Sequence, residues 1–301
     1  MRVLVAGSSG FLGQHLLERL RGDGHTVDAL VRRPPGAGEV QWDPYAGDAA
    51  ARVVDAVADH DVIVNLAGAP LVGNPHSRRW AEAVRHSRVT TTRVLAEAIA
   101  AAGTKPAFLA GNGISWYGDQ GADELTESAG TVGDSLLTSV TREWQAATEP
   151  AADAGSRVVV LRTAPVFDRT SPPLKQLRLL FSLGLGGPIG DGRQYFPVIS
   201  LRDWIDGVAH LTSSDVAGPA NLCCPTTPTN TEFTKALAGL LHRPAFFRVP
   251  APVIRVAAGP MAPEALGSIR AVPATLLDSG FAFADPDVSA VLTTALRTRP
   301  H

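Results

Sequence analysis

Cysteine is scarce in this chain of 301 residues, since only Cys223 and Cys224 are present and they are adjacent. Neighbouring cysteines suit neither an ordinary disulfide nor a metal site, so we expect two small apolar residues at the end of a strand. The eight histidines show no ligand spacing. The sequence therefore predicts no metal centre.

Long apolar runs and an excess of one charge are also lacking. No segment is apolar over the length that spans a bilayer, and Met1-Arg2-Val3 leads into a strand rather than a signal peptide. A formal net charge of -2, with acids and bases interspersed, gives no footprint for nucleic acid or for an anionic membrane. We expect a cytoplasmic protein that binds a small molecule. Its oligomeric state stays open.

A glycine-rich turn follows the first apolar run, Arg2 to Ala6, directly. Its sequence is Gly7-Ser8-Ser9-Gly10-Phe11-Leu12-Gly13, and the segment after it has a leucine face at helical spacing. The first glycine permits a tight turn, the second lets the backbone approach a pyrophosphate, and the third allows helix and strand to pack closely. Strand, turn and helix together predict a dinucleotide-binding turn at the amino end of a helix.

Apolar runs of strand length alternate with helical patterns through the first half of the chain. We expect a helix at 80–102, the end of another helix at 143–154, and strands at 2–6, 26–31, 61–65, 107–110 and 158–161. Repeated strand–helix units of this kind predict an α/β fold with a doubly wound parallel, Rossmann-type sheet. The length allows one large domain, or a large and a small one.

The pattern changes after Phe167, where prolines and glycines break the regular alternation. We expect residues 1–168 to form an NADP(H)-binding domain and 169–301 a smaller C-terminal substrate lobe. Within 197–222, a helix at 201–212 and a strand at 220–222 are expected to return to the first domain. Ligands of such folds bind at the carboxyl ends of the strands, which predicts a site between the lobes.

Four further motifs accompany the turn. They are Asn65-Leu66-Ala67-Gly68 after a strand, Trp116-Tyr117-Gly118, Gly190-Asp191-Gly192-Arg193-Gln194, and Asn230 to Phe233 followed by Leu241 to Pro244. With the GxxGxxG spacing of the turn, they resemble the extended short-chain dehydrogenase/reductase superfamily and its epimerase/dehydratase-like subgroup. The resemblance implies a nicotinamide dinucleotide that contacts the glycine turn and Leu66, Ala67 and Gly68. It implies a fold and a cofactor better than a substrate.

The end of the second strand indicates which dinucleotide binds. Arg32 and Arg33 stand where an acidic side chain would accept hydrogen bonds from a ribose 2′-hydroxyl, and arginine there pairs with a 2′-phosphate. Asp28 lies too early in the strand to reach the ribose. We therefore expect NADP(H). The alternative is that both arginines are solvated loop residues before Pro34.

The usual catalytic pair of the superfamily, Tyr-x-x-x-Lys, is missing. The matching positions are Leu136 and Val140, and no lysine stands between Lys105 and Lys175. The superfamily's Ser/Thr falls at Gly113. Neither a proton acceptor nor an ammonium group to hold the ribose is available at these positions.

Other polar groups are candidates for catalysis. Tyr117 is a phenol after the fifth strand, and Ser115 and Asn112 are hydrogen-bond donors beside it. The alternatives are a packed aromatic ring for Tyr117 and turn chemistry for the other two.

A second group of candidates lies in the loop with Arg193, Gln194 and Tyr195, which suits substrate binding because a guanidinium grips carboxylates and phosphates. A surface hairpin is the alternative for this loop. For Asp203, a place in the first turn of a helix is a better prediction than catalysis.

These observations favour an NADP(H)-dependent oxidoreductase that acts on a small substrate with non-standard catalytic groups. The alternative is a catalytically silent NADP(H)-binding sensor or scaffold protein, which the missing Tyr and Lys favour. A nucleotide-sugar epimerase/dehydratase is the third hypothesis, since reversible oxidation of a sugar hydroxyl most needs the missing base.

Overall fold

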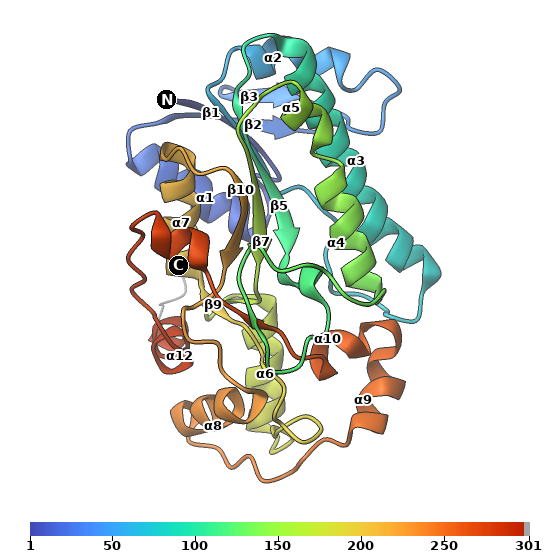
Figure 1. Ribbon diagram of the computed structural model, residues 1–301, viewed down its shortest axis with the longest axis vertical. Coiled ribbons are helices and arrows are strands. Elements are labelled where there is room, and N and C mark those ends of the chain that lie inside the picture. Colours follow the sequence, from blue (N-terminus) through green and yellow to red (C-terminus); the bar gives the residue numbers. More distant parts are fainter. Residues whose placement is uncertain (298–301) are drawn as a thin grey trace. The chain divides into compact units, whose positions relative to one another are not determined.

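The computed structural model describes residues 1–297, so His301 lies outside the described residues. A seven-stranded sheet has the strand order β10-β7-β5-β4-β1-β2-β3 (Figure 1). The strands are β1 (Arg2–Ala6), β2 (Thr26–Val31), β3 (Glu39–Gln41), β4 (Val62–Asn65), β5 (Ala107–Gly113), β7 (Val158–Thr163) and β10 (Gly218–Leu222). From β5 across to β3 each neighbouring pair is parallel. The predicted Rossmann-type parallel sheet is confirmed.

Residues 1–297 also contain twelve α-helices. They are α1 (Phe11–Gly22), α2 (Val54–Ala58), α3 (Arg78–Ala102), α4 (Leu136–Ala146), α5 (Glu149–Asp153), α6 (Pro172–Ser182), α7 (Leu201–Ser213), α8 (Asn230–Leu241), α9 (Ala251–Ala258), α10 (Ala262–Leu266), α11 (Ala274–Asp278) and α12 (Val288–Arg297). The short strands β6 (Glu124–Leu125) and β11 (Arg270–Ala271) pair with each other, as do β8 (Val166–Phe167) and β9 (Ile199–Ser200). Three short 3-10 turns cover Ala51–Val53, Ile114–Tyr117 and Gly259–Met261.

Pro172 and Pro173 begin α6, because proline fits the first helical turn, where its missing N–H costs no hydrogen bond. One sequence-based expectation about helices needs correction. The single helix expected to end at 154 is two helices, since α4 ends at Ala146 and Pro150 stands in the first turn of α5. Strand β3 was not anticipated, because three residues carry too little pattern.

The chain divides into two compact units. Unit 1 comprises residues 1–112, 140–161 and 208–219, and unit 2 comprises 113–139, 162–207 and the chain from Ala220 onward. The loop after β5 therefore belongs to the unit that contains the C-terminal segment, since β6 pairs with β11. These boundaries differ from the expected one after Asp168. That the second unit binds substrate stays a prediction.

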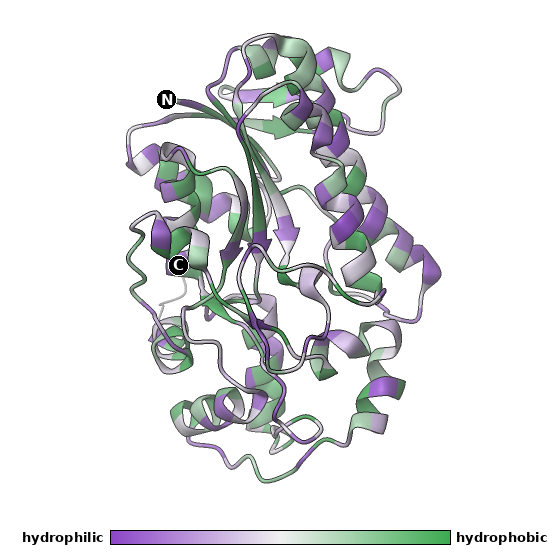
Figure 2. Cartoon of the chain, viewed as in Figure 1, coloured by the Kyte–Doolittle hydropathy of each residue, from purple (hydrophilic) through white to green (hydrophobic). Residues whose placement is uncertain are grey.

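The core of unit 1 lies between the sheet and its helices. Leu4, Ile63 and Phe108 of the strands pack with Leu95 and Ile99 of α3, and all five are fully buried. Figure 2 shows the strands as mainly hydrophobic, while α3 carries hydrophilic residues along its length. The apolar face of α3 is buried against the sheet and its polar face is solvated, as its amphipathic pattern predicts.

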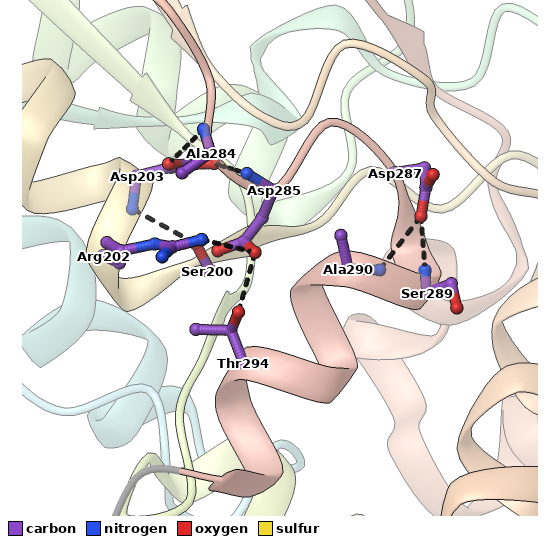
Figure 3. A network of polar contacts seen from close by, with 9 residues as sticks. All are labelled: Ser200, Arg202, Asp203, Ala284, Asp285, Asp287, Ser289, Ala290 and Thr294. Carbon is purple, nitrogen blue, oxygen red and sulfur yellow. Dashed lines mark hydrogen bonds and ion pairs between the residues drawn. The ribbon is translucent and has the colours of Figure 1, made fainter.

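A polar network in unit 2 joins the start of α7 to the chain before α12 (Figure 3). The carboxylate of Asp203 accepts hydrogen bonds from the backbone N–H groups of Ala284, at 3.0 Å, and Asp285, at 2.8 Å. The carboxylate of Asp285 in turn accepts from Arg202 and from Thr294. Asp203 thus lies in the first turn of α7 and holds a distant segment by its backbone.

Replacing Asp203 by alanine should lower the free energy of unfolding by about 1–3 kcal/mol, because two backbone N–H groups would lose their acceptor. Chemical denaturation measures this change. Asp278→Ala, an exposed acid at the end of α11, is the control and should change stability little. Equal stability of the two variants would contradict the structural role of Asp203.

Candidate functional site

The glycine turn between β1 and α1 packs backbone against backbone. Gly7 has a φ of +83°, and a Cβ there would lie 2.5 Å from the carbonyl carbon of Leu66. A Cβ on Gly13 would lie 2.2 Å from the carbonyl oxygen of Gly7. Both glycines are therefore required by the protein's own packing, the first against the loop after β4 and the third against the turn itself.

Gly10 is less tightly packed than the other two glycines. A Cβ there would lie 3.3 Å from the carbonyl oxygen of Gly7, a close contact that a small shift would relieve, and Gly10 is exposed. It is the N-cap of the twelve-residue helix α1 and supplies no side-chain cap. The first N–H groups of α1 thus have no side-chain cap, and uncapped N–H groups at the amino end of a helix suit an anion.

The loop after β4 is fixed to α3 by its own side chains. Asn65 is fully buried, its amide donates to the hydroxyl of Thr92 at 2.9 Å, and its carbonyl accepts from the N–H of Ala67 at 3.0 Å. The N–H of Ala69 donates to Ser87 at 2.9 Å. These bonds hold Leu66, Ala67 and Gly68 against the glycine turn.

Arg88 of α3 lies beside this loop and was not anticipated from the sequence. Its guanidinium donates to the carbonyl of Ala69 at 3.1 Å and stacks 5.3 Å from the centre of the Trp144 ring. Burial lowers the pKa of Arg88 to about 10. Within residues 1–297 no carboxylate forms an ion pair with it, so a partly desolvated cation stands next to Gly68.

The two arginines after β2 have different partners. Arg33 forms a double hydrogen bond with Glu39 of β3, at 2.7 and 2.5 Å, which raises the pKa of Arg33 and lowers that of Glu39. Arg32 is exposed and has no ion-pair partner in the described chain. Asp28 lies 3.0 Å from the ring of His60. Arg32 is therefore the one of the two arginines that remains available for a ligand.

Tyr117 is a packed aromatic residue with a fully satisfied hydroxyl. Its ring is fully buried, and the hydroxyl lies 2.8 Å from the amide oxygen of Asn221 while it accepts from Arg162 at 3.0 Å. Burial raises the pKa of Tyr117, and the neighbouring Arg162 opposes this shift. This geometry favours the structural interpretation of Tyr117 over the catalytic one.

Asn112 and Ser115 have separate surroundings. The buried amide of Asn112 donates to the carbonyl of Thr141 at 3.1 Å, which ties the end of β5 to α4 within unit 1. Ser115 lies in unit 2, where its hydroxyl is 2.5 Å from a carboxylate oxygen of Glu264 on α10. The structure therefore separates the two candidates and gives Ser115 an acidic partner 149 residues away.

Glu264 stands in a pocket of unit 2 whose volume is about 270 Å³. Ser135, at 3.5 Å, is close to its second oxygen, and the hydroxyl of Ser135 lies 2.8 Å from that of Thr138. Thr138 also donates to the carbonyl of Ser115 at 3.0 Å. Burial raises the pKa of Glu264, although the two serines act in the opposite direction. No sequence motif marks this residue.

The loop expected to bind substrate contacts the segment that carries Glu264. Gln194 donates to the carbonyl of Ala265 at 3.1 Å, and the N–H of Tyr195 donates to Ser268 at 3.0 Å. Arg193 is exposed, and its N–H donates to the side chain of Asp191 at 3.0 Å. Gln194 and Tyr195 thus support the wall of the pocket.

Metal and membrane features can be stated for residues 1–297. No group of three or more His, Cys, Asp or Glu side chains there is arranged to hold a metal ion. None of the helices in that part of the chain has the length and apolarity to cross a membrane. Cys223 and Cys224 are fully buried after β10, which raises the pKa of Cys224 to about 12.

Comparison with known families gives two matches. Residues 3–183 match the NAD dependent epimerase/dehydratase family, and residues 249–295 match a domain of unknown function, DUF1731. The second match contains Glu264. The pocket therefore combines residues from both matched segments.

Individual relatives cover almost the whole chain. An epimerase family protein of Mycobacterium leprae is 37% identical over 99% of this chain and 96% of its own length, and epimerase family protein SDR39U1 of Mus musculus is 36% identical over 97% and 98%. Human SDR39U1, solved with NADPH, has a TM-score of 0.85 at 30% identity and covers 99% of this chain and 100% of its own.

A solved nucleoside-diphosphate sugar epimerase from Corynebacterium glutamicum has a TM-score of 0.79 at 31% identity. The match covers 98% of this chain but only 58% of that one. Similarity to this structure thus extends over the whole of this chain, while the other protein has further segments.

Tyr117→Phe should lower the free energy of unfolding by about 1–3 kcal/mol, because the buried amide oxygen of Asn221 would lose its hydroxyl donor. Thermal and chemical denaturation measure the loss. Tyr45→Phe, at an exposed ring, is the control and should leave stability unchanged. If Tyr117→Phe were as stable as the wild type, the structural role would be refuted.

Proposed function

Because this chain belongs to the NAD dependent epimerase/dehydratase family, we propose that it is an NADP(H)-dependent oxidoreductase of the short-chain dehydrogenase type, acting on a small substrate. The observation that carries the proposal is the contrast within the glycine turn. Gly7 and Gly13 have no room for a Cβ, whereas Gly10 is exposed at an uncapped helix end and a Cβ there would make one close contact, 3.3 Å from the carbonyl oxygen of Gly7. A bound pyrophosphate is the physical reason for glycine there.

The residues of unit 1 fit a dinucleotide in three respects. The amino end of α1 receives the pyrophosphate, and the loop Leu66, Ala67 and Gly68 lies against the same turn. Arg88 offers a cation beside that loop, in a chain that lacks the superfamily's lysine. When bound, the nicotinamide supplies or accepts a hydride.

NADP(H) rather than NAD(H) is supported by the second strand. Arg32 is exposed and has no ion-pair partner among the described residues, so its guanidinium is available for a 2′-phosphate. Arg33 is held by Glu39. The human relative that was solved with NADPH supports the same choice.

The silent sensor or scaffold remains the second candidate, favoured by Leu136 and Val140 at the catalytic positions and by the buried hydroxyl of Tyr117. The sensor or scaffold hypothesis predicts that the protein binds NADPH without turnover of any substrate. A nucleotide-sugar epimerase is the third candidate, and the relative from Corynebacterium glutamicum supports it. The missing base argues against it.

We expect NADPH to bind at least tenfold more tightly than NADH, because charge-assisted pairing with the extra phosphate is worth roughly 1.5–3 kcal/mol. Titration of both cofactors by fluorescence measures the preference. Arg32→Ala should remove most of it, whereas Arg33→Ala, which loses mainly its bond to Glu39, should remove less. Equal affinities in the wild type, or a preference that survives the double variant, would refute the assignment.

Gly10→Val should abolish binding of NADPH while the melting temperature changes little, because the side chain would occupy the place of the pyrophosphate. Gly22→Val, at an open position of the same helix, is the matched control and should bind normally. Gly13→Val should destabilise the fold itself, since its Cβ would collide with Gly7. Normal affinity of Gly10→Val would show that this glycine serves no ligand.

A further inference from the structure

One region of unit 2 combines cations with exposed apolar side chains, and the binding of a dinucleotide requires neither. This basic apolar surface consists of residues 175–185, from α6 and the loop after it, and residues 240–256, from the end of α8 into α9. We propose that it binds an anionic phospholipid bilayer, with phosphate headgroups at the cations and apolar side chains inserted beside them. The inference goes beyond the proposed function and does not depend on it.

The first argument is a pocket that gathers cations. Its volume is about 400 Å³, and its lining consists of Lys175, Arg178, Leu179, Ser182, Leu241 and Arg243. Helix α6 packs on α8, so cations of α6 and of the chain after α8 meet at one hollow (Figure 1). The lining contains no acid, and no carboxylate within residues 1–297 forms an ion pair with these cations. Ammonium and guanidinium groups of this kind bind phosphate.

The second argument is the distribution of charge along the chain. Residues 169–190 and 233–263 contain no Asp and no Glu, and their cations are Arg169, Lys175, Arg178, Lys235, Arg243, Arg248 and Arg255. The formal net charge of the whole chain, -2, conceals this segregation because the acids lie in other segments. The whole-chain charge therefore gives no indication of an anionic membrane, whereas this surface has the excess of cations that attracts anionic lipids.

The third argument is the exposure of large apolar side chains near the pocket. The exposed fraction is 86% for Phe246 and 72% for Phe247, which are neighbours in the loop between α8 and α9. Exposed leucines of α6 and of the loop after it are Leu179, Leu180, Leu183 and Leu185. Apolar side chains gathered on a surface indicate a contact with a membrane or with another molecule, because their exposure to water is unfavourable.

Helix α9 also has apolar residues on its outer side. None of its eight residues is buried. Val253 and Val256 are three positions apart and so share a face of the helix, and they are 53% and 77% exposed. A helix that packs on a protein core buries such a face, so this face is available to enter an apolar medium. Arg255 adds a cation to the same short helix, as is typical of helices that lie at a membrane surface.

Hydrogen bonds join the two segments of the basic apolar surface. The N–H of Val249 donates to the carbonyl of Pro188, and the N–H of Gly190 donates to the carbonyl of Val249, each at 2.9 Å. The loop with Phe246 and Phe247 therefore lies beside the chain that follows α6. The cations and the apolar side chains thus belong to one continuous region of unit 2.

A bilayer fits this surface better than a second copy of the chain or an acidic protein does. A two-fold interface would set the cations of one copy against those of the other, which is repulsive. A protein partner would need a shaped pocket for each protruding phenylalanine, whereas the fluid boundary of a bilayer accepts apolar side chains of any shape. The phosphate headgroups lie at that same boundary and pair with the cations.

Co-sedimentation of the full chain with lipid vesicles tests the proposal. We expect binding to vesicles of phosphatidylglycerol mixed with phosphatidylcholine, and much weaker binding to vesicles of phosphatidylcholine alone. Binding should weaken as the salt concentration rises, because salt screens the attraction between cations and phosphate. Equal binding to both kinds of vesicle, or binding to neither, overturns the proposal.

The double variant Lys175→Gln with Arg178→Gln tests the cationic pocket. Each cation near an anionic bilayer strengthens binding by a factor of about five, so this variant should bind about thirtyfold less tightly. Arg78→Gln with Arg79→Gln, at two exposed positions of α3 in unit 1, changes the net charge equally and is the matched control. An equal loss in both double variants would show a response to net charge alone and overturns the pocket as the lipid site.

The double variant Phe246→Ser with Phe247→Ser tests insertion. Both side chains are exposed, so the melting temperature should stay the same, while affinity for the anionic vesicles should fall roughly tenfold or more because burial of the rings in the bilayer is lost. Leu71→Ser with Val72→Ser, at exposed apolar positions of unit 1, is the control and should bind normally. Full binding of the phenylalanine variant contradicts insertion.

Soluble anions separate a bilayer from the other occupants. Inorganic phosphate and polyglutamate carry negative charge without an apolar phase, so we expect both to bind less tightly than the anionic vesicles and to bind the phenylalanine variant as they bind the wild type. Polyglutamate that binds as tightly as the vesicles overturns the bilayer in favour of an acidic protein. Inorganic phosphate that displaces the protein from vesicles at low concentration overturns it in favour of a free phosphate.

Discussion

The contact of the Gly7 backbone with the loop after β4 is the constraint on which the cofactor side of this protein depends. With no Cβ at Gly7, the turn after β1 closes directly against Leu66 and Ala67. Because the turn is this tight, α1 begins immediately behind it, and its uncapped amino end lies beside the same loop. Asn65, bonded to Thr92 and to Ala67, keeps that loop in position from the other side. The uncapped amino end of α1 thus follows directly on this tightly packed turn.

Local sequence was sufficient to predict this part of the molecule. The ranges of β1 and β2 agree with the structure residue for residue, because apolar runs bounded by glycine or charge leave little freedom. The packing roles of Gly7 and Gly13 also follow from spacing, while the role of Gly10 toward a pyrophosphate stays a prediction. The sequence did not predict the ion pair of Arg33 with Glu39. Glu39 lies opposite Arg33 because it belongs to β3, and that strand is too short to be recognised from its pattern.

The contact between Ser115 and Glu264 joins residues that are distant in sequence, and motifs did not predict it. Glu264 meets Ser115 only because α10 and the segment up to β11 pack on the loop after β5. A single glutamate on a short helix has no signal of its own, whereas Tyr117 stands in a motif and attracts attention. The hydroxyl of Tyr117 instead donates to Asn221 and accepts from Arg162. These hydrogen bonds lower the free-energy cost of burying the two polar side chains.

The sequence leads us to expect that the Tyr-x-x-x-Lys pair is absent, and in the superfamily that pair combines two separable tasks. The lysine lowers the pKa of the phenol and holds the ribose, so removing both residues leaves a need for a proton donor and for a cation. In this chain burial raises the pKa of the Glu264 carboxyl, while the hydrogen bonds from Ser115 and Ser135 act in the opposite direction. Arg88, stacked on Trp144 next to Gly68, is a cation that no carboxylate pairs with among residues 1–297. The acid and the cation belong to different compact units, and each is fixed by its own neighbours.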